Sequence, residues 1–188
     1  MTYDLPKAVE VCGVPYDIRS DYRAILDICV ALSDPELSER EKAYIALWIF
    51  YPAVEAGEMP PEHQLEALKR CFTFIGCDQP EEKENKRAPR LVDWEKDFPY
   101  IVAPVNRALG FEVRGVSYLH WWTFVSAFMD IPGDCTFSQV LSIRRKLAHH
   151  KKLNKAEQEW YRNNRDLVQI GTRYTEAEEN ILKQWGGV

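Results

Sequence analysis

Apolar residues recur at helical intervals in several successive segments of this chain, and this spacing limits the folds that it can adopt. These segments are bounded by capping side chains such as Ser38, with Glu41 three residues on, and by stop residues such as Pro52 and Gly110. The pattern predicts about eight short helices. A chain of 188 residues buries a sizeable core without a metal or disulfide staple. We therefore expect a mainly α fold, built as a compact multi-helix domain.

The N-terminus departs from the helical pattern. Two β-prone runs, 8–11 and 14–18, flank Cys12-Gly13, which predicts a small N-terminal β-hairpin. Residues 78–90 contain no large apolar side chain and predict a mobile loop. Because we find no internal repeat, we expect residues 1–188 to form a single helical domain.

The sequence also predicts the position, the shape or the buried face of individual helices. The helix ending at Pro52 is apolar on nearly all sides, which predicts a central position. A helix from Asp93 to Leu109 contains Pro104, which predicts a kink or a break. The helix that follows Pro60-Pro61 is expected to turn one apolar face inward, formed by Leu65, Leu68, Cys71, Phe72 and Ile75.

Two further helices are expected in the second half. One is strongly apolar and extends from Tyr118 to Met129. The other begins near the capping box of Thr175 and Glu178, after which Ile181, Leu182 and Trp185 follow.

Catalytic and metal-binding patterns are weak. Cys71 and Cys77 are six residues apart and histidines 149–150 are adjacent, whereas structural zinc ligands come in more closely spaced pairs. Asp93 and Asp97 share a helical face, but acids in a first helical turn ordinarily cap the helix and complement its dipole. The chain has no Gly-rich phosphate loop. We therefore expect no enzymatic activity, no cofactor and no metal.

A basic stretch is the clearest charge feature. Residues 141–165 carry eight basic and two acidic side chains, although the whole chain has 24 Lys and Arg against 29 Asp and Glu. Such an excess favours an acidic partner, and a solvated face is the simpler explanation. Nucleic acid is disfavoured because the chain is acidic overall and has no readable recognition-helix motif. The candidate basic patch comprises Arg144, Arg145, Lys146, Lys151, Lys152 and Lys155.

An aromatic segment is the second candidate site. Within 119–129, polar residues recur only at His120, Thr123 and Ser126, so a helix here is buried on most sides. A place in the core is the simpler explanation. The alternative is that one ring lines a groove for a partner's apolar helix. The candidate partner-binding residues are His120, Trp121, Trp122, Phe124 and Phe128.

Membrane insertion and export are not expected. The longest uncharged apolar stretch, 116–129, is too short to span a bilayer. The first residues have neither a basic head nor an apolar run, and the five cysteines are an odd number, so we expect reduced thiols in a cytosol.

The second half contains a family skeleton. It consists of Asp93-Trp94-Glu95-Lys96-Asp97, Tyr100-Ile101, Leu119-His120-Trp121-Trp122-x-Phe124 and Phe137-x-x-Val140-Leu141-x-Ile143-Arg144. This skeleton resembles the bacteriophage gene-product-fifteen family of long-tailed phages and prophages. The resemblance covers about residues 1–150 and is densest in 93–144. The chain departs from the family pattern at Pro99 and Pro104, within a helix that is regular in the family.

The resemblance implies a role in phage tail morphogenesis. Members of the family are typically encoded between the major tail protein and the tape-measure protein. This placement implies a non-enzymatic chaperone that binds the tape-measure protein, or another tail protein, in the host bacterial cytoplasm during assembly. A structural component of the phage tail is the alternative, and a homo-oligomer is left open.

Overall fold

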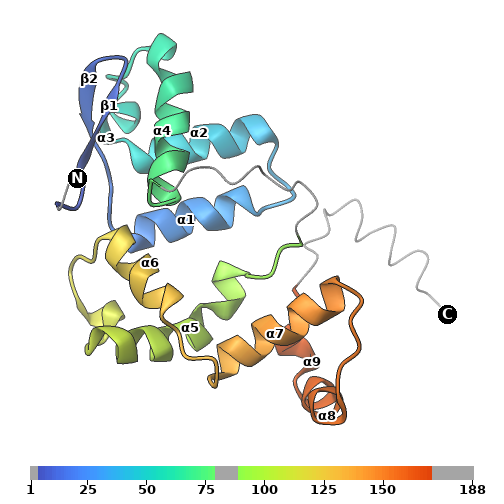
Figure 1. The fold of residues 1–188 in the computed structure, drawn as a ribbon. Coiled ribbons are helices and arrows are strands. Elements are labelled where there is room, and N and C mark those ends of the chain that lie inside the picture. Colours follow the sequence, from blue (N-terminus) through green and yellow to red (C-terminus); the bar gives the residue numbers. More distant parts are fainter. Residues whose placement is uncertain (1–3, 79–88, 171–188) are drawn as a thin grey trace.

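The computed structural model describes residues 4–78 and 89–170, which form a helical body with a β-hairpin at its N-terminal end (Figure 1). Strands β1 (Ala8–Val11) and β2 (Val14–Asp17) pair antiparallel. Cys12 and Gly13 connect them with φ angles of 51° and 79°. Positive φ at both central residues is the requirement of the two-residue turn that matches strand twist. The predicted hairpin is confirmed.

The mainly α fold is also confirmed. The described helices are α1 (Tyr22–Leu32), α2 (Glu39–Phe50), α3 (Pro52–Glu55), α4 (Gln64–Ile75), α5 (Trp94–Leu109), α6 (Trp121–Met129), α7 (Thr136–Ala148), α8 (Lys155–Asn163) and α9 (Arg165–Val168). Short 3-10 turns at Pro61–His63 and Val113–Gly115 complete the order. Ser38 and Glu41 form the expected capping box of α2.

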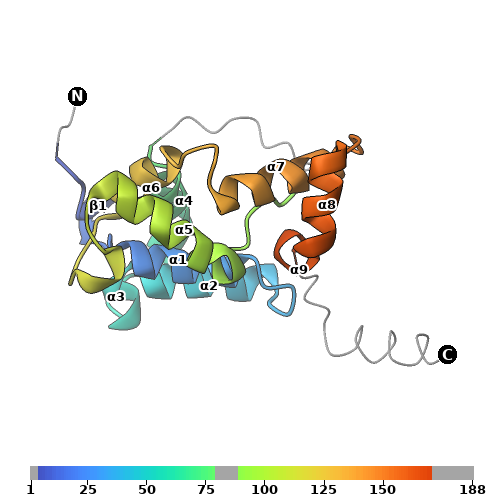
Figure 2. The same cartoon turned by 90° about the horizontal axis from the view of Figure 1, so that it is seen from below.

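The core is centred on α1, which packs against α2, α5 and α6. Tyr22, Ile25 and Ile28 of α1 are buried, and the Tyr22 ring stacks on Phe124 of α6 with 4.8 Å between centroids. Helices α7, α8 and α9 lie together at the end of the body opposite the hairpin and α3 (Figure 2). One face of α1 therefore lies opposite α5.

Two helices are less completely buried than the sequence pattern predicted. α2 packs against α1, α3 and α4, but Tyr44 and Trp48 on its outer face are 58% and 42% exposed. On α4, the expected inward residues Leu65 and Phe72 are exposed, whereas Cys71 is buried as expected. Packing of α4 against α2 and β1 also buries Ala67 and Phe74, which the sequence pattern did not single out. Both helices are apolar over more surface than their neighbours cover, so the packing partner selects the buried face.

Of the kink or break expected near Pro104, the break does not occur, because α5 continues through Pro99 and Pro104 to Leu109. Pro104 is itself buried, and its helical neighbours Ile101 and Val105 are fully buried. Packing of these side chains offsets the backbone hydrogen bond that a proline cannot donate. Gly110, with φ at 77°, then ends the helix in the left-handed conformation that favours glycine.

Helix α6 begins at Trp121, three residues later than predicted, because His120 serves as its N-cap. None of the helices in the two described ranges combines the length and apolar character needed to cross a membrane. The loop expected at 78–90 lies almost entirely outside the described residues, and so does the helix expected near Thr175.

Candidate functional site

The Leu119-His120-Trp121-Trp122 string forms a junction between the starts of α1 and α6. An antiparallel bridge pairs Asp21 with His120. The Tyr22 amide donates to the Leu119 carbonyl at 2.9 Å, and the Leu119 amide donates to the Asp21 carboxylate at 2.9 Å. Asp21 also caps α1 by accepting from the amide of Arg23. One carboxylate therefore fixes the start of α1 against the segment that leads into α6.

The His120 ring extends this junction to the N-terminal segment. Its Nδ1 accepts from the Trp122 amide at 3.1 Å, which caps α6, and its Nε2 lies 2.9 Å from the Pro6 carbonyl. A carbonyl can only accept, so Nε2 carries the proton and the ring is neutral. Burial lowers the pKa of His120, which favours this neutral form.

Trp121 and Trp122 join α6 to the last turn of α4. The two indole N–H groups donate to the carbonyls of Ile75 and Phe74, each at 2.9 Å. The Phe74 carbonyl also accepts from the Cys77 backbone amide at 3.0 Å, so the indole N–H groups add side-chain donors to the C-terminal cap of α4. The tryptophan pair thus has a structural role, and that role accounts for the spacing of the string.

The five candidate partner-binding residues do not form one surface. His120, Trp121 and Phe124 are buried, whereas Trp122 and Phe128 are half-buried. The Phe128 ring packs on Trp94 of α5 at 5.0 Å between centroids. The simpler interpretation, that the aromatic segment belongs to the core, agrees with these contacts. A partner groove lined by all five side chains does not agree with these contacts.

Arg144, the first residue of the candidate basic patch, is not part of an exposed surface. Arg144 is buried, and its guanidinium is surrounded by acceptors from three other parts of the chain. The prediction failed because a basic run in the sequence does not reveal that one of its members faces a buried carboxylate. Lys146 is half-buried and paired with Glu157. The remaining members are exposed near the α7–α8 turn: Arg145, Lys151, Lys152 and Lys155.

The carboxylates that share a face of α5 are also structural. Asp93 caps the helix by accepting from the Lys96 amide at 3.2 Å. Asp97 accepts from the Asp93 amide and from the Arg144 guanidinium. Burial raises the pKa of the Cys71 thiol to about 12, which suppresses the thiolate that nucleophilic attack requires. No group of three or more metal-ligating side chains occurs within the described residues.

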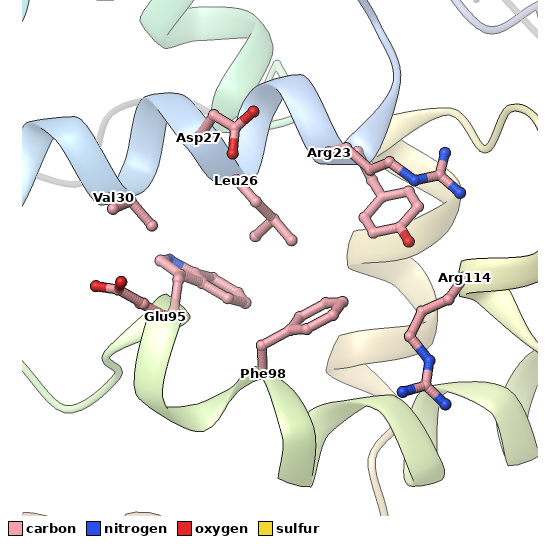
Figure 3. Close-up of a pocket in the computed structure, with 9 residues that line it drawn as sticks. Arg23, Leu26, Asp27, Val30, Glu95, Phe98 and Arg114 are labelled. Atoms are coloured by element: carbon pink, nitrogen blue, oxygen red, sulfur yellow. The ribbon is translucent and has the colours of Figure 1, made fainter.

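An open groove lies between α1 and α5. It encloses about 420 Å³. Leu26 of α1 and Phe98 of α5 face one another across it, and Val30 lies toward one end (Figure 3). The Tyr22 and Phe98 rings stack with 6.5 Å between centroids. The lining residues are Tyr22, Arg23, Leu26, Asp27, Val30, Trp94, Glu95, Phe98 and Arg114.

The charged residues on the rim of the groove differ in whether they have hydrogen-bond or ion-pair partners. Arg23 is held by Asp21 and by the Val116 carbonyl at 2.6 Å, and Arg114 pairs with Glu112. Asp27, by contrast, has no hydrogen-bond or ion-pair partner among the described residues. Partial burial raises the pKa of Asp27. The floor of this groove is complementary to an apolar side chain of a partner. Asp27 is complementary to a cationic side chain beside it.

Sequence reasoning missed this groove. Its α1 wall has a helical signal, since Arg23, Leu26, Asp27 and Val30 follow the spacing of a single helix face. That spacing does not show that the face stays partly uncovered. The groove exists because α5 crosses near α1 and leaves part of the apolar surface open.

Comparison with known proteins identifies the family. The family model described as bacteriophage Gp15 protein matches residues 1–170. The match therefore includes the junction, the groove and helices α8 and α9, and it extends beyond the resemblance over about residues 1–150. No match was found among curated proteins or among solved structures. The chain belongs to the bacteriophage Gp15 protein family.

Proposed function

We propose that this bacteriophage protein is a non-enzymatic tail assembly chaperone that binds an amphipathic helix of the tape-measure protein. The observation that carries the proposal is the α1–α5 groove, with its aromatic floor and open top. Two helical walls with an apolar floor form the usual receptor for a third helix. The position of family genes beside the tape-measure gene, expected from the resemblance, supports this partner.

The lining of the groove suits anchoring side chains from a helix. Trp94 and Phe98 are half-buried, so they offer ring faces without leaving the fold. Aromatic residues at such positions contribute large contact area at small entropic cost. Asp27 at the edge would pair with a Lys or Arg placed beside the apolar stripe of the client helix. The client chemistry is therefore an apolar stripe flanked by a basic residue.

A groove of this size also suits transient binding. Small interfaces give weak complexes that dissociate readily. A chaperone for a tape-measure helix must release it while tail subunits polymerise around that helix. Competition by the tail subunits would be enough for release, and no nucleotide is required by this scheme.

The proposal is tested by co-expression with the tape-measure protein of the same phage. The wild-type chain should raise the soluble fraction of that protein. Asp27→Arg, which changes an exposed side chain at the groove, should reduce the effect. Glu159→Arg on α8 is the matched control, because it makes the same charge change at an exposed residue outside the groove. Unchanged solubility with the wild-type chain would reject the chaperone function.

Purified phage particles separate this function from the alternative. A chaperone should be absent from finished particles, whereas a structural component should be present at a fixed stoichiometry. Mass spectrometry of purified virions makes the comparison. Stoichiometric recovery of this chain would favour the structural component.

A further inference from the structure

We infer that the outer edge of strand β1 binds an extended, basic segment of a partner polypeptide, which adds to the hairpin as a third strand. The site lies between β1 and α4 and shares no lining residue with the α1–α5 groove, so it is independent of the proposed function. Three features lead to it: unpaired backbone groups on β1, a hollow beside them, and the charge of the side chains that line this hollow.

The register of the hairpin shows which backbone groups of β1 are unpaired. The Ile18 amide donates to the Lys7 carbonyl at 3.0 Å, and hydrogen-bonded and non-hydrogen-bonded pairs alternate along an antiparallel ladder. Ala8 and Glu10 therefore occupy non-hydrogen-bonded positions, so their amides and carbonyls point away from β2. None of these four groups has a hydrogen-bond partner within residues 4–78 and 89–170. They are the groups that an added strand would bind.

The outer edge of β2, by contrast, is blocked. Pro15 lies opposite Glu10 and has no N–H, so this edge offers fewer donors to another strand. A proline at an edge is a common protection against strand addition. Strand β1 contains no proline, and both Ala8 and Glu10 are exposed. The hairpin thus has one blocked edge and one open edge.

A hollow of about 400 Å³ lies along the open edge, where β1 packs against α4 (Figure 1). Ala8, Val9 and Glu10 all line this hollow. Successive side chains of a strand point to opposite faces, so three consecutive residues can line one hollow only at the strand edge. The Pro6 carbonyl, just before β1, is bound by His120 and marks one end of the open edge. The hollow therefore has the position that an added strand would take.

The two faces of the hairpin specify alternating side chains in the added strand. A partner residue opposite Val9 would point to the inner face, where Val9 packs against the core. Phe74 and Trp122 line the hollow there, and their rings stack with 5.5 Å between centroids. This partner residue should therefore be apolar. The residues opposite Ala8 and Glu10 would point to the exposed outer face and should be polar.

The charge of the lining favours a basic partner. Glu10 and Asp78 line the hollow, and neither has an ion-pair partner among the described residues. The basic side chain of the lining, Arg70, already pairs with Glu66 at 3.0 Å. Opposite charges directly across a strand pair are favourable, and like charges are not. The partner segment should therefore carry Lys or Arg opposite Glu10, beside its apolar residue.

The direct test uses the full chain and the synthetic peptide acetyl-Thr-Val-Lys-Val-Lys-Thr-amide, which alternates apolar and basic residues as this edge requires. Water-exchange NMR of the isotope-labelled protein measures the exchange rate of each backbone amide. With about nine-tenths of the sites filled, exchange of the Ala8 and Glu10 amides should slow by about tenfold, because only the free fraction exchanges. The amide of Asp17 on the blocked edge is the internal control and should exchange at an unchanged rate.

Two variants locate the binding at this edge. Ala8→Pro removes an outward amide but none of the bonds between β1 and β2, and it should weaken peptide binding by at least about tenfold. Asp17→Pro is the matched control, because it removes an outward amide from β2, and it should bind like wild type. Circular dichroism compares the folding of both variants with that of wild type. Equal peptide affinities of Ala8→Pro and Asp17→Pro would overturn the assignment to β1.

A charge reversal tests the site without a backbone change. Glu10→Lys should bind the lysine peptide about threefold more weakly than wild type, and its counterpart acetyl-Thr-Val-Glu-Val-Glu-Thr-amide more tightly. Glu159→Lys on α8 is the control and should leave both affinities unchanged. Equal effects of Glu10→Lys on the two peptides would overturn the basic character of the partner.

The exchange rates also distinguish the other occupants of this edge. Unchanged rates at Ala8 and Glu10 with the lysine peptide in large excess would overturn strand addition. Slow exchange in the free protein at every concentration would show that the chain covers its own edge. Slow exchange that appears only as the protein concentration rises would indicate a second copy. Either of these last two results would overturn the assignment to a partner polypeptide.

Discussion

The Arg144 guanidinium of α7 donates two parallel hydrogen bonds to the Asp97 carboxylate of α5, at 2.5 and 2.9 Å. Both side chains are only 3% exposed. The remaining N–H groups of Arg144 donate to the carbonyls of Leu91, Leu167 and Val168. All five donors of the guanidinium are thus used. This one side chain joins α7 to α5, to α9 and to the segment before α5.

Replacing Arg144 should therefore destabilise the fold strongly. Arg144→Met leaves the Asp97 charge buried without its partner, and we expect a loss of about 3–5 kcal/mol in the free energy of unfolding. Urea titration followed by circular dichroism measures the change. Arg145→Met on the neighbouring exposed position is the control and should change stability by less than about 0.5 kcal/mol. Equal losses from the two variants would contradict the structural role of Arg144.

Stability should fall as the solution becomes more acidic, through His120. Burial lowers the pKa of His120 in the folded state below its unfolded value of about 6.5. The unfolded state therefore binds a proton first, so this contribution to stability is complete above pH 6.5 and is lost as pH falls toward the folded pKa. Protonation of Nδ1 would also remove the acceptor that caps α6.

Urea titrations at pH 7.5 and pH 5.5 measure this effect. His120→Asn keeps a capping side chain but cannot titrate, so its stability should change less between the two pH values than that of wild type. His63→Asn removes a different histidine and should retain the pH dependence. If the wild type and His120→Asn lost stability equally on acidification, His120 would not be the group responsible.

The indole of Trp121 should contribute to the stability of α4. Trp121→Phe keeps an aromatic ring and removes the N–H that donates to the Ile75 carbonyl. We expect a loss of about 1 kcal/mol in the free energy of unfolding, because the part-buried Ile75 carbonyl loses its indole donor. Trp48→Phe on the exposed face of α2 is the matched control. Denaturant titration of both variants decides whether the loss is specific to position 121.

Nucleic-acid binding should be absent at low salt. The exposed basic residues lie near one turn, but Arg144 is not among them. Electrophoretic mobility shift at low salt, with double-stranded DNA, makes the measurement. A shift that weakens with salt by about 0.9 logarithmic units per contacted phosphate would contradict this expectation. Its loss in a variant with Ala at positions 145, 151, 152 and 155 would then locate the site.

The sequence indicated the type of most elements because their signals are local. Ser38 and Glu41 mark a helix start by their own side chains, and Cys12-Gly13 marks a turn by its backbone requirement. The His120 cap of α6 was missed because histidine is an unusual residue at that position. The continuation of α5 past Pro104 excludes the break, which was one of the two expected outcomes, because packing around Pro104 offsets the local cost of proline.

The candidate site depended on information that the sequence alone does not contain. The sequence singled out the aromatic string and the basic run, and the structure shows Trp121 capping α4 and Arg144 buried on Asp97. Neither partner is near in sequence, so spacing could not reveal the contact. Periodicity identifies an apolar face, but not whether a neighbour covers it.

Local chemistry thus made the helical class and the hairpin predictable from the sequence, and the family was recognised from the resemblance of its sequence skeleton. The tertiary structure alone decided which apolar faces were covered, which charges were paired, and that a groove remained between α1 and α5. The physical reason is that capping and turn formation involve residues a few positions apart. Burial and ion pairing join residues such as Asp97 and Arg144, which meet only when the helices pack.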